Sequence, residues 1–467
     1  MWCCKVPPRR SSLISPNGDR LTQASDIEEL FSAHTHVEHI LRFEAALARA
    51  QARAGLIPME AASAIETACR VDTFDVEALL RESSRAGTIV IPLVKQLTAQ
   101  TSAAGRDFVH WGATSQDAID TALVLQMRDG LGAIESELRV IAEVAAQLAT
   151  THRRSVMPGR TLMQHAVPIT FGLKAARWLA AITRQIATLR ALRRDALVLQ
   201  FGGAAGTLAP LGDDGERVAQ LLGEELQLPV PELPWHAERD RPAAVIAALG
   251  VMAGVLAKIA GDVILLGQTE IAEVAEGAAH GKGGSSAMPQ KRNPVDAVQA
   301  IVSARLVVGL VPVALSAMEQ EHERSAGSWQ TEWIVIPDAF RHSFRSAEHV
   351  AASLTTLDVR ADQMRANLAV ASGTLMSESL ATALAHHVGR SQALAIVGDI
   401  ARRALDGSTS LGDVARADTR IRSVLDAPTL DRALDPEANL GSTDRFIDRA
   451  IAAWNALCHP ERATNTA

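Results

Sequence analysis

The chain has 467 residues, of which 48% are hydrophobic and 3% aromatic, and its formal net charge is −7. This length and apolar content predict a large buried core, whereas the absence of tyrosine argues against a β-sandwich or a base-stacking surface. The negative net charge excludes a general attraction to nucleic acid or to an anionic membrane, so an anionic substrate would need a local positive pocket.

The first residues and the cysteines favour a cytoplasmic protein. Residues 1–24 are rich in Pro, Ser and Arg and lack the apolar segment of a secretory signal, so we interpret them as a loose leader. The four cysteines show no metal-binding spacing, and reduced thiols are expected. The longest uncharged apolar run, residues 242–257, has 16 residues. A membrane-spanning helix needs roughly 20, so a helix buried on all sides explains this run better.

Apolar residues recur every three or four positions through most of the chain, which predicts helices. The first helical pattern runs from Asp26 to Ala54 and is closed by Gly55, and the second follows Pro58. Further helices are predicted over residues 88–102, 118–150, 169–200, 242–275, 295–321 and 337–355, with shorter ones from Val359 onward. Long helices without strand signals indicate an all-α bundle.

Breaks in this pattern suggest a division of the chain into a leader and three helical domains. The predicted parts are the leader (1–24), an N-terminal helical domain (25–114), a central long-helix bundle (115–357) and a small C-terminal helical domain (358–467).

Polar residues interrupt the long helices in four stretches, at 110–117, 159–165, 276–296 and 320–333. If these breaks meet at one level of a bundle, they together supply Thr114, Ser115, Arg160, His165, Lys291, Asn293 and Arg324. This mixture of hydroxyls, an amide and cations suits a dicarboxylate or tricarboxylate, because the guanidinium fork matches a carboxylate. The acids Glu270, Glu273 and Glu276 are interpreted instead as a solvated or interface-facing stripe on one helix face.

The stretch 276–296 is rich in glycine at its start and contains two prolines near its end. Glycine permits movement and proline stiffens the chain, so the stretch could order over a small anionic ligand. A simple connector between helices has a similar composition. The spacing does not fit a phosphate-binding loop, because Gly283 follows Lys282 where that motif requires a hydroxyl residue.

The segment Gly284-Ser-Ser-Ala-Met-Pro-Gln-Lys-Arg-Asn-Pro294 resembles the signature loop of the fumarase/aspartase superfamily. His110-Trp-Gly-Ala-Thr-Ser-Gln-Asp117 is similar to the first signature of the same superfamily. Its members add or eliminate a group beside a carboxylate through an enolate-like intermediate. The resemblance implies a three-domain, all-α fold with a central bundle.

The resemblance also implies roles for individual residues. Ser285 matches the serine that acts as the base at Cα, and His110 matches a histidine of the adenylosuccinate lyase branch. The matched carboxylate-binding positions are Thr114, Ser115, Lys291, Asn293 and Arg324. Other residues that are expected to bind substrate are Arg160, Gln164 and Ser286 of these stretches, and Gln268, which precedes the third stretch.

One position departs from the superfamily pattern. The second signature usually places a histidine after Gly-x-Thr, but Leu162 follows Gly159-Arg-Thr161 here. His165 lies three residues further along the chain. It either replaces the missing histidine as an acid or base, or has a purely structural role. The bacterial 3-carboxy-cis,cis-muconate cycloisomerases tolerate this change, and residues 35–455 resemble them. The resemblance therefore implies lactonisation of 3-carboxy-cis,cis-muconate in protocatechuate catabolism.

The same resemblance implies a homotetramer in which each site is shared between subunits, acting on a small polycarboxylate without a cofactor or metal. Two alternatives remain. One is a β-elimination lyase that releases fumarate from a nitro- or amino-substituted succinate, and the other is a structural helical protein without activity. The candidate residues Ser285, Lys291 and Asn293 argue against the second alternative.

Overall fold

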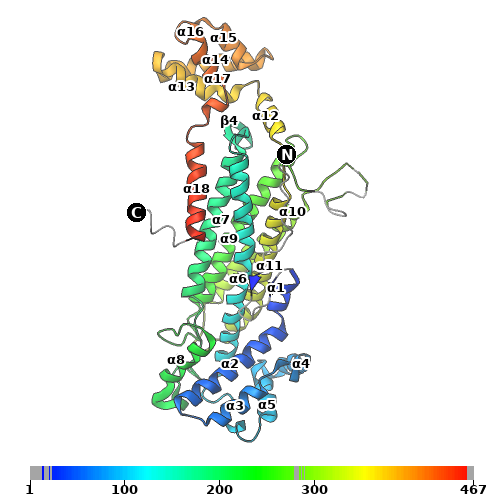
Figure 1. Ribbon diagram of the computed structural model, residues 1–467, viewed down its shortest axis with the longest axis vertical. Coiled ribbons are helices and arrows are strands. Elements are labelled where there is room, and N and C mark those ends of the chain that lie inside the picture. The colour runs from blue at the N-terminus through cyan, green and yellow to red at the C-terminus, as the bar shows by residue number, and fades with distance from the viewer. Residues whose placement is uncertain are drawn as a thin grey trace. The chain divides into compact units, whose positions relative to one another are not determined.

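The computed structural model describes residues 13–14, 20–21, 24–277, 283–284, 287–288 and 290–459, which are mostly helical (Figure 1). The chain forms two compact units. Unit 1 comprises Met1–Glu137, Ile186–Ala257 and Ala300–Glu348, and unit 2 comprises Leu138–Gln185, Lys258–Gln299 and His349–Ala467. The predicted all-α fold is confirmed, whereas the four-part division proposed from the sequence stays a prediction.

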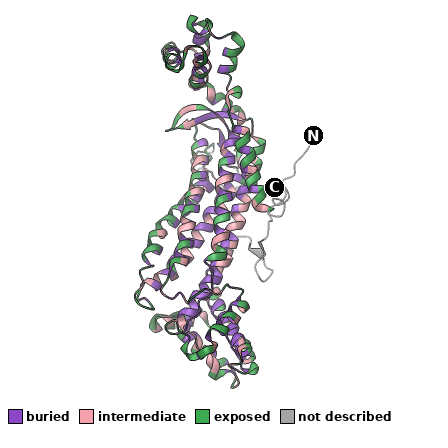
Figure 2. Ribbon diagram, turned by 90° about the vertical axis from the view of Figure 1, so that its left-hand side faces the viewer, coloured by how far each residue is buried: buried purple, intermediate pink, exposed green. Residues whose placement is uncertain are grey.

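Five long helices contribute a segment to each unit. They are α6 (Ser115–Thr151), α7 (Phe171–Asp195), α9 (Asp240–Leu266), α10 (Val295–Ser316) and α11 (Ser328–Thr355). Along most of them buried and exposed residues alternate, as an amphipathic helix requires (Figure 2). Polar bonds join the helices within each unit: Ser346 Oγ of α11 donates to the Ala300 carbonyl in unit 1, at 3.0 Å, and Trp178 Nε1 of α7 donates to Asp262 of α9 in unit 2, at 2.8 Å.

Unit 1 also contains five helices of the N-terminal part and one helix, α8, from the middle of the chain. They are α1 (Ala24–Leu30), α2 (Ala33–Ala54), α3 (Met59–Ala68), α4 (Val76–Ala86), α5 (Val90–Gln100) and α8 (Gly215–Leu226), with a short strand pair β1 (Leu13–Ile14) and β2 (Arg20–Leu21). Helix α2 begins where Ser32 Oγ accepts a hydrogen bond from the Thr35 amide and ends at Gly55, whose φ is 82°. Both caps follow from residue type, and the glycine stop agrees with the sequence-based prediction.

Unit 2 adds four strands and a group of shorter helices. The strands are β3 (Val156–Thr161), β4 (Gln164–Thr170), β5 (Val274–Ala275) and β6 (Asp358–Val359). The helices are α12 (Ala361–Ala369), α13 (Ser377–Val388), α14 (Arg390–Asp406), α15 (Leu411–Ala417), α16 (Thr419–Arg422), α17 (Ala427–Leu434) and α18 (Thr443–Cys458). Residues of α13 to α17 enclose their own apolar core, which includes Leu380, Leu384, Ile400 and Leu411.

Three sequence-based expectations about elements are wrong in detail. The stretch 159–165 is predicted as a polar break between helices without strand signals, but it lies within the antiparallel β3–β4 hairpin. The helix predicted over 242–275 stops at Leu266, so Glu270, Glu273 and Glu276 do not share a helix face. Helix α11 begins at Ser328 and contains Pro337, whereas the predicted helix starts at that proline. In each case the local sequence pattern misplaces the end of an element. Tertiary packing outweighs the local preference of the residues there.

Helices α9 and α10 are long and apolar enough to cross a membrane by length and composition. The sequence predicts no membrane-spanning helix, because its longest uncharged apolar run has only 16 residues. Helix α9 is longer than this run, since it continues past the charged residues Lys258 and Asp262 to Leu266. These two charged residues form an ion pair with one another. Only 28% of the apolar window of α10 is buried in this chain, compared with 50% for α9. Helix α10 therefore presents an uncovered apolar side.

The tip of the β3–β4 hairpin holds two large apolar residues in the left-handed region. Leu162 and Met163 have φ values of 48° and 65° and are 96% and 70% exposed. They form a two-residue turn, since Thr161 pairs with Gln164. Turns with positive φ at both positions favour Asn-Gly, and bulky side chains raise the backbone energy there.

Replacing Leu162 by asparagine and Met163 by glycine is expected to increase the free energy of unfolding by about 1–2 kcal/mol, because the strain disappears. Urea denaturation at fixed protein concentration measures the change. The control is the Leu162→Ala, Met163→Ala double variant, which removes the same apolar surface but keeps Cβ atoms at positive φ. Equal stabilities of the two double variants would contradict the strain explanation.

Candidate active site

The first candidate segment is the turn from His110 to Ser115, which leads into α6. Gly112 has a φ of 79°, and a Cβ atom there would lie 2.7 Å from the Leu211 side chain. The turn is anchored by Asp117, whose Oδ2 accepts a hydrogen bond from the Thr114 amide at 3.0 Å. Asp117 is the third residue of α6, so its side chain closes the helix start by accepting from the backbone amide of the residue before the helix. Thr114 and Ser115 lie at the positive end of the α6 dipole, which favours an anion.

Asp117 is completely buried and joins three segments of unit 1. Its Oδ1 accepts from Gly202 N at 3.0 Å and from Gln200 Nε2 at 3.1 Å, and lies 2.8 Å from His236 Nε2. Its Oδ2 also accepts from Gly203 N, at 2.9 Å. One carboxylate thus fixes the Thr114 turn against the glycine-rich stretch at 201–206.

A buried ion cluster lies one helical turn further along α6. Arg239 Nη1 and Nη2 bind Asp120 at 2.7 and 3.1 Å, and Arg239 Nε binds Glu332 at 3.0 Å. The three side chains are at most 5% exposed. Burial lowers the pKa of the Arg239 guanidinium, but Asp120 and Glu332 outweigh it, and the net pKa lies above its ordinary value. Burial raises the pKa of the Glu332 carboxyl because it disfavours the charged form, and the nearby Asp120 charge adds to this, while Arg239 opposes it.

Arg324, a predicted carboxylate-binding residue, lies beside the start of α6. Its Nε donates to Gln116 Oε1 at 2.9 Å, and its Nη2 donates to the Ala204 carbonyl at 3.1 Å. Because Gln116 follows Ser115 directly, the structure brings Arg324 together with the Thr114–Ser115 pair. These contacts agree with the expectation that stretches 110–117 and 320–333 meet.

His110 is paired with a carboxylate that the sequence analysis did not select. His110 Nδ1 lies 2.6 Å from Oε1 of Glu44, a residue of α2 that is 1% exposed. Burial lowers the pKa of His110, but the charge and hydrogen bond of Glu44 outweigh burial and the pKa is raised. An acid within the apolar stripe Phe43-Glu-Ala-Ala-Leu was the available signal. The pair orients the imidazole and leaves Nε2 as its other functional atom.

The raised pKa of His110 makes the contribution of Glu44 depend on pH. The stabilisation is complete below the unfolded value near 6.5 and declines as pH rises through the folded pKa. Glu44→Gln is therefore expected to reduce the free energy of unfolding by about 2 kcal/mol at pH 6 and by clearly less at pH 9. Urea midpoints across this range measure the difference. A difference that widens with pH would contradict the assignment.

The remaining candidates that the structure describes lie in unit 2. Arg160 and His165 face each other across the β3–β4 ladder, next to the Thr161–Gln164 pair. Arg160 Nη1 and Nη2 bind the carboxylate of Glu273 at 2.9 and 2.7 Å, so the Nη1/Nη2 fork of this guanidinium is already occupied by a protein carboxylate. Burial and the Arg160 charge lower the pKa of His165.

The acids at the end of α9 do not form the solvated stripe that was expected. Glu273 is 0% exposed and also accepts a bond from Asn367 Nδ2, at 2.8 Å. Glu276 accepts from the Asp296 and Ala297 amides at 3.1 and 2.8 Å and so caps the start of α10. Gln268 is exposed, and its carbonyl accepts from the amides of residues 271 and 272.

The signature loop is described only in part. Ser285 and Ser286, the predicted base and its neighbour, lie outside the described residues. The Asn293 amide donates to the Gly283 carbonyl at 2.9 Å, and the Lys291 amide donates to the Met288 carbonyl at 3.0 Å. These bonds fold the end of the loop back toward its glycines and leave the Lys291 side chain exposed.

The candidate residues therefore form two sets, one in each unit. Unit 1 holds His110, Thr114, Ser115 and Arg324, and unit 2 holds Arg160, Gln164, His165, Gln268, Lys291 and Asn293. The first set combines hydroxyls, a helix start, a histidine and an arginine, which together can bind a carboxylate and handle a proton. The second set contributes an ammonium group and an amide. Among the residues with described placement, no group of three acids, histidines or cysteines is arranged to hold a metal ion.

Comparison with known proteins gives consistent results along the chain. The family described as Lyase matches residues 18–309, and the family described as Adenylosuccinate lyase C-terminus matches residues 373–450. A 3-carboxy-cis,cis-muconate cycloisomerase of Bradyrhizobium diazoefficiens is 42% identical, over 94% of this chain and 98% of that protein. A nitrosuccinate lyase of Streptomyces davaonensis is 39% identical, over 97% of this chain and 96% of that protein.

The fold is similar to that of a solved structure, the 3-carboxy-cis,cis-muconate lactonizing enzyme from Pseudomonas putida. The TM-score is 0.87 at 40% sequence identity, and the match covers 93% of this chain and 98% of that one.

Proposed function

Because the chain belongs to the lyase family of the fumarase/aspartase superfamily, we propose that this enzyme lactonises 3-carboxy-cis,cis-muconate. The observation that carries the proposal is the tip of the β3–β4 hairpin, where the superfamily pattern has a histidine. Here the tip carries Leu162 and Met163, which have no proton to exchange. An intramolecular addition has no leaving group to protonate, so it tolerates an aliphatic tip, whereas elimination of an amine benefits from an acid there.

In the proposed reaction one substrate carboxylate oxygen attacks the β-carbon of the activated double bond. The C=C electron pair moves to the α-carbon and onto its carboxylate, giving an aci-carboxylate, and a proton then adds to the α-carbon. The attacking group is already tethered, so proximity supplies much of the acceleration. The Lys291 ammonium and the Asn293 amide stabilise the charge that grows on this carboxylate. Ser285 is proposed to deliver the proton, with His110 or His165 as a second titratable group.

Thr114, Ser115 and Arg324 are proposed to bind the other carboxylates, supported by their grouping at the start of α6. Gln164, Gln268 and Ser286 remain proposed substrate contacts. Arg160 is proposed to contact the substrate while it keeps its ion pair with Glu273. No cofactor or metal is part of the proposal, and the reaction is placed in the cytoplasm, in protocatechuate catabolism.

Self-association is proposed from the uncovered side of α10. Val302, Leu306 and Val313 are 48%, 47% and 39% exposed and recur at helical spacing. Association of such faces would bury them and assemble a homotetramer with sites shared between subunits. Sedimentation of the active enzyme tests this, and an active monomer would refute it.

The substrate assay follows the ultraviolet absorbance of 3-carboxy-cis,cis-muconate, which falls as its conjugation is lost. The wild-type enzyme is expected to consume it, and Ser285→Ala is expected to lower kcat by about 10²–10⁴-fold with little change in KM. Ser63→Ala, at an exposed serine of α3, is the matched control and should leave kcat unchanged. Undiminished turnover by Ser285→Ala would remove the assignment of the proton donor. Release of fumarate from nitrosuccinate, without consumption of the muconate, would favour the alternative that the 39% identical nitrosuccinate lyase suggests.

A further inference from the structure

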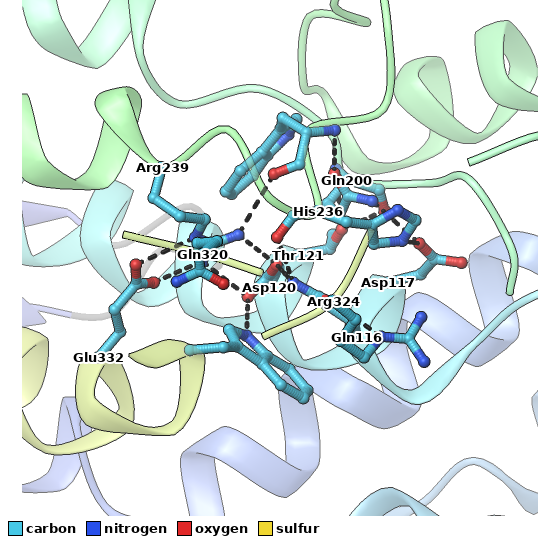
Figure 3. Close-up of polar contacts among 12 residues, drawn as sticks. Gln116, Asp117, Asp120, Thr121, Gln200, His236, Arg239, Gln320, Arg324 and Glu332 are labelled. Atoms are coloured by element: carbon cyan, nitrogen blue, oxygen red, sulfur yellow. Dashed lines mark hydrogen bonds and ion pairs between the residues drawn. The ribbon is translucent and has the colours of Figure 1, made fainter. Parts of the chain in front are cut away.

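Gln116 connects the buried ion cluster of unit 1 to the candidate substrate arginine. It is 0% exposed, in the first turn of α6. Its Nε2 donates to Asp120 Oδ2 at 3.1 Å and to the His236 carbonyl at 2.8 Å, while its Oε1 accepts from Arg324 Nε at 2.9 Å (Figure 3). All the hydrogen-bonding atoms of this side chain are therefore engaged.

The orientation of the Gln116 amide is determined by its surroundings. Asp120 and the His236 carbonyl offer only acceptor oxygens, so they require the NH₂ group on their side. A flipped amide would place an oxygen against two acceptors and an NH₂ against the Arg324 donor. The amide oxygen consequently faces Arg324.

The ion cluster reinforces this orientation. It contains two carboxylates, Asp120 and Glu332, and one guanidinium, Arg239, so its formal charge is negative while all three side chains are buried. The excess negative charge attracts the NH₂ end of the Gln116 dipole and, beyond it, the Arg324 cation. Trp329 Nε1 also donates to Asp120, at 2.9 Å, which holds that carboxylate in place.

Arg324 needs such support because its long side chain is exposed. An unsupported arginine loses much rotamer freedom when it binds a ligand, which weakens binding. Here Gln116 and the Ala204 carbonyl engage Nε and Nη2. No protein acceptor for Nη1 is present in the described part of the chain, so this nitrogen is available for a carboxylate.

We propose that Gln116, oriented by Asp120 and the His236 carbonyl, is a positioning residue that holds Arg324 ready for a substrate carboxylate. The inference rests on the proposed function in so far as Arg324 binds substrate. It assigns to Gln116 no direct contact with the reacting atoms.

The test is the variant Gln116→Met, which keeps the side-chain length and removes both hydrogen-bonding ends. KM for the substrate is expected to rise about 10-fold or more, with kcat changed by less than about 3-fold, because mainly carboxylate binding is lost. The matched control is Thr121→Val on the same helix. It removes two buried hydrogen bonds, since Thr121 Oγ1 donates to the Gln200 carbonyl at 2.9 Å and accepts from the Gln200 amide at 3.2 Å, but it does not touch Arg324. Its KM is expected to stay within about 2-fold of wild type.

A double-mutant cycle with Arg324→Met separates positioning from general destabilisation. If Gln116 acts through Arg324, Gln116→Met should not raise KM further in the Arg324→Met background. An equal rise in both backgrounds, or a rise in Thr121→Val as large as in Gln116→Met, would overturn the inference. The cycle uses whichever substrate the wild-type enzyme converts, carboxymuconate or a substituted succinate. Failure of the proposed substrate is therefore distinguishable from failure of the role of Gln116.

Discussion

Asp117→Asn is expected to lower the free energy of unfolding by about 2–6 kcal/mol, although the two side chains have nearly the same shape. Whichever oxygen becomes NH₂, at least two of the donors Thr114 N, Gly203 N, Gly202 N and Gln200 Nε2 lose their acceptor. Each buried donor left without an acceptor costs about 1–3 kcal/mol. Urea denaturation at fixed protein concentration measures the loss.

The same change is expected to reduce kcat/KM by about 10²-fold in protein that remains folded, because the Thr114–Ser115 turn is no longer held in place. Asp213→Asn is the control, since Asp213 is exposed and its loss should leave both quantities unchanged. A folded Asp117→Asn enzyme with wild-type kcat/KM would show that the turn does not depend on this carboxylate.

Glu273→Leu is expected to destabilise unit 2 by about 3–5 kcal/mol, because it leaves the Arg160 guanidinium largely buried without its partner. Asn367 Nδ2 loses one of its two acceptors as well and keeps the Ile271 carbonyl. The double variant Glu273→Leu, Arg160→Met removes both charges and should recover most of the loss, since apolar replacements of a buried pair are often tolerated.

Urea midpoints of the two single variants and the double variant, at the same protein concentration, give the coupling between the residues. A double variant no more stable than Glu273→Leu would show that the carboxylate matters for reasons other than Arg160. Glu276→Ala is a useful comparison, because that buried acid contacts backbone amides at the start of α10. Its loss should cost only about 1 kcal/mol, as for other helix caps.

The helical architecture follows from local patterns that can be recognised in the sequence. Helix α2 shows this most clearly, since its apolar spacing, its Ser32 cap and its Gly55 stop all depend on neighbouring residues. The β3–β4 hairpin could not be predicted in this way. Its tip, Leu162-Met163, has none of the usual turn residues, and the strands are stabilised by contacts far along the chain, such as Arg160 with Glu273.

The candidate site likewise contains residues that the sequence identifies and residues that only the structure reveals. Motif order identified Thr114, Ser115, Lys291, Asn293 and Arg324 as candidates. Glu44 had one sequence signal, its place within an apolar stripe. The sequence did not indicate the roles of Gln116 and Glu273, because these depend on the partners that surround the buried side chains.

The sequence by itself determined that this is an all-α protein of the fumarase/aspartase superfamily, because helix periodicity and the signature loop are properties of consecutive residues. Only the tertiary structure decided which charged residues are buried and what they bind. Asp117 and Glu273 look like ordinary helix-cap or surface acids in the chain, yet both are fully buried. Their partners are 83 or more residues away in several cases, so their roles exist only after folding has brought those groups together.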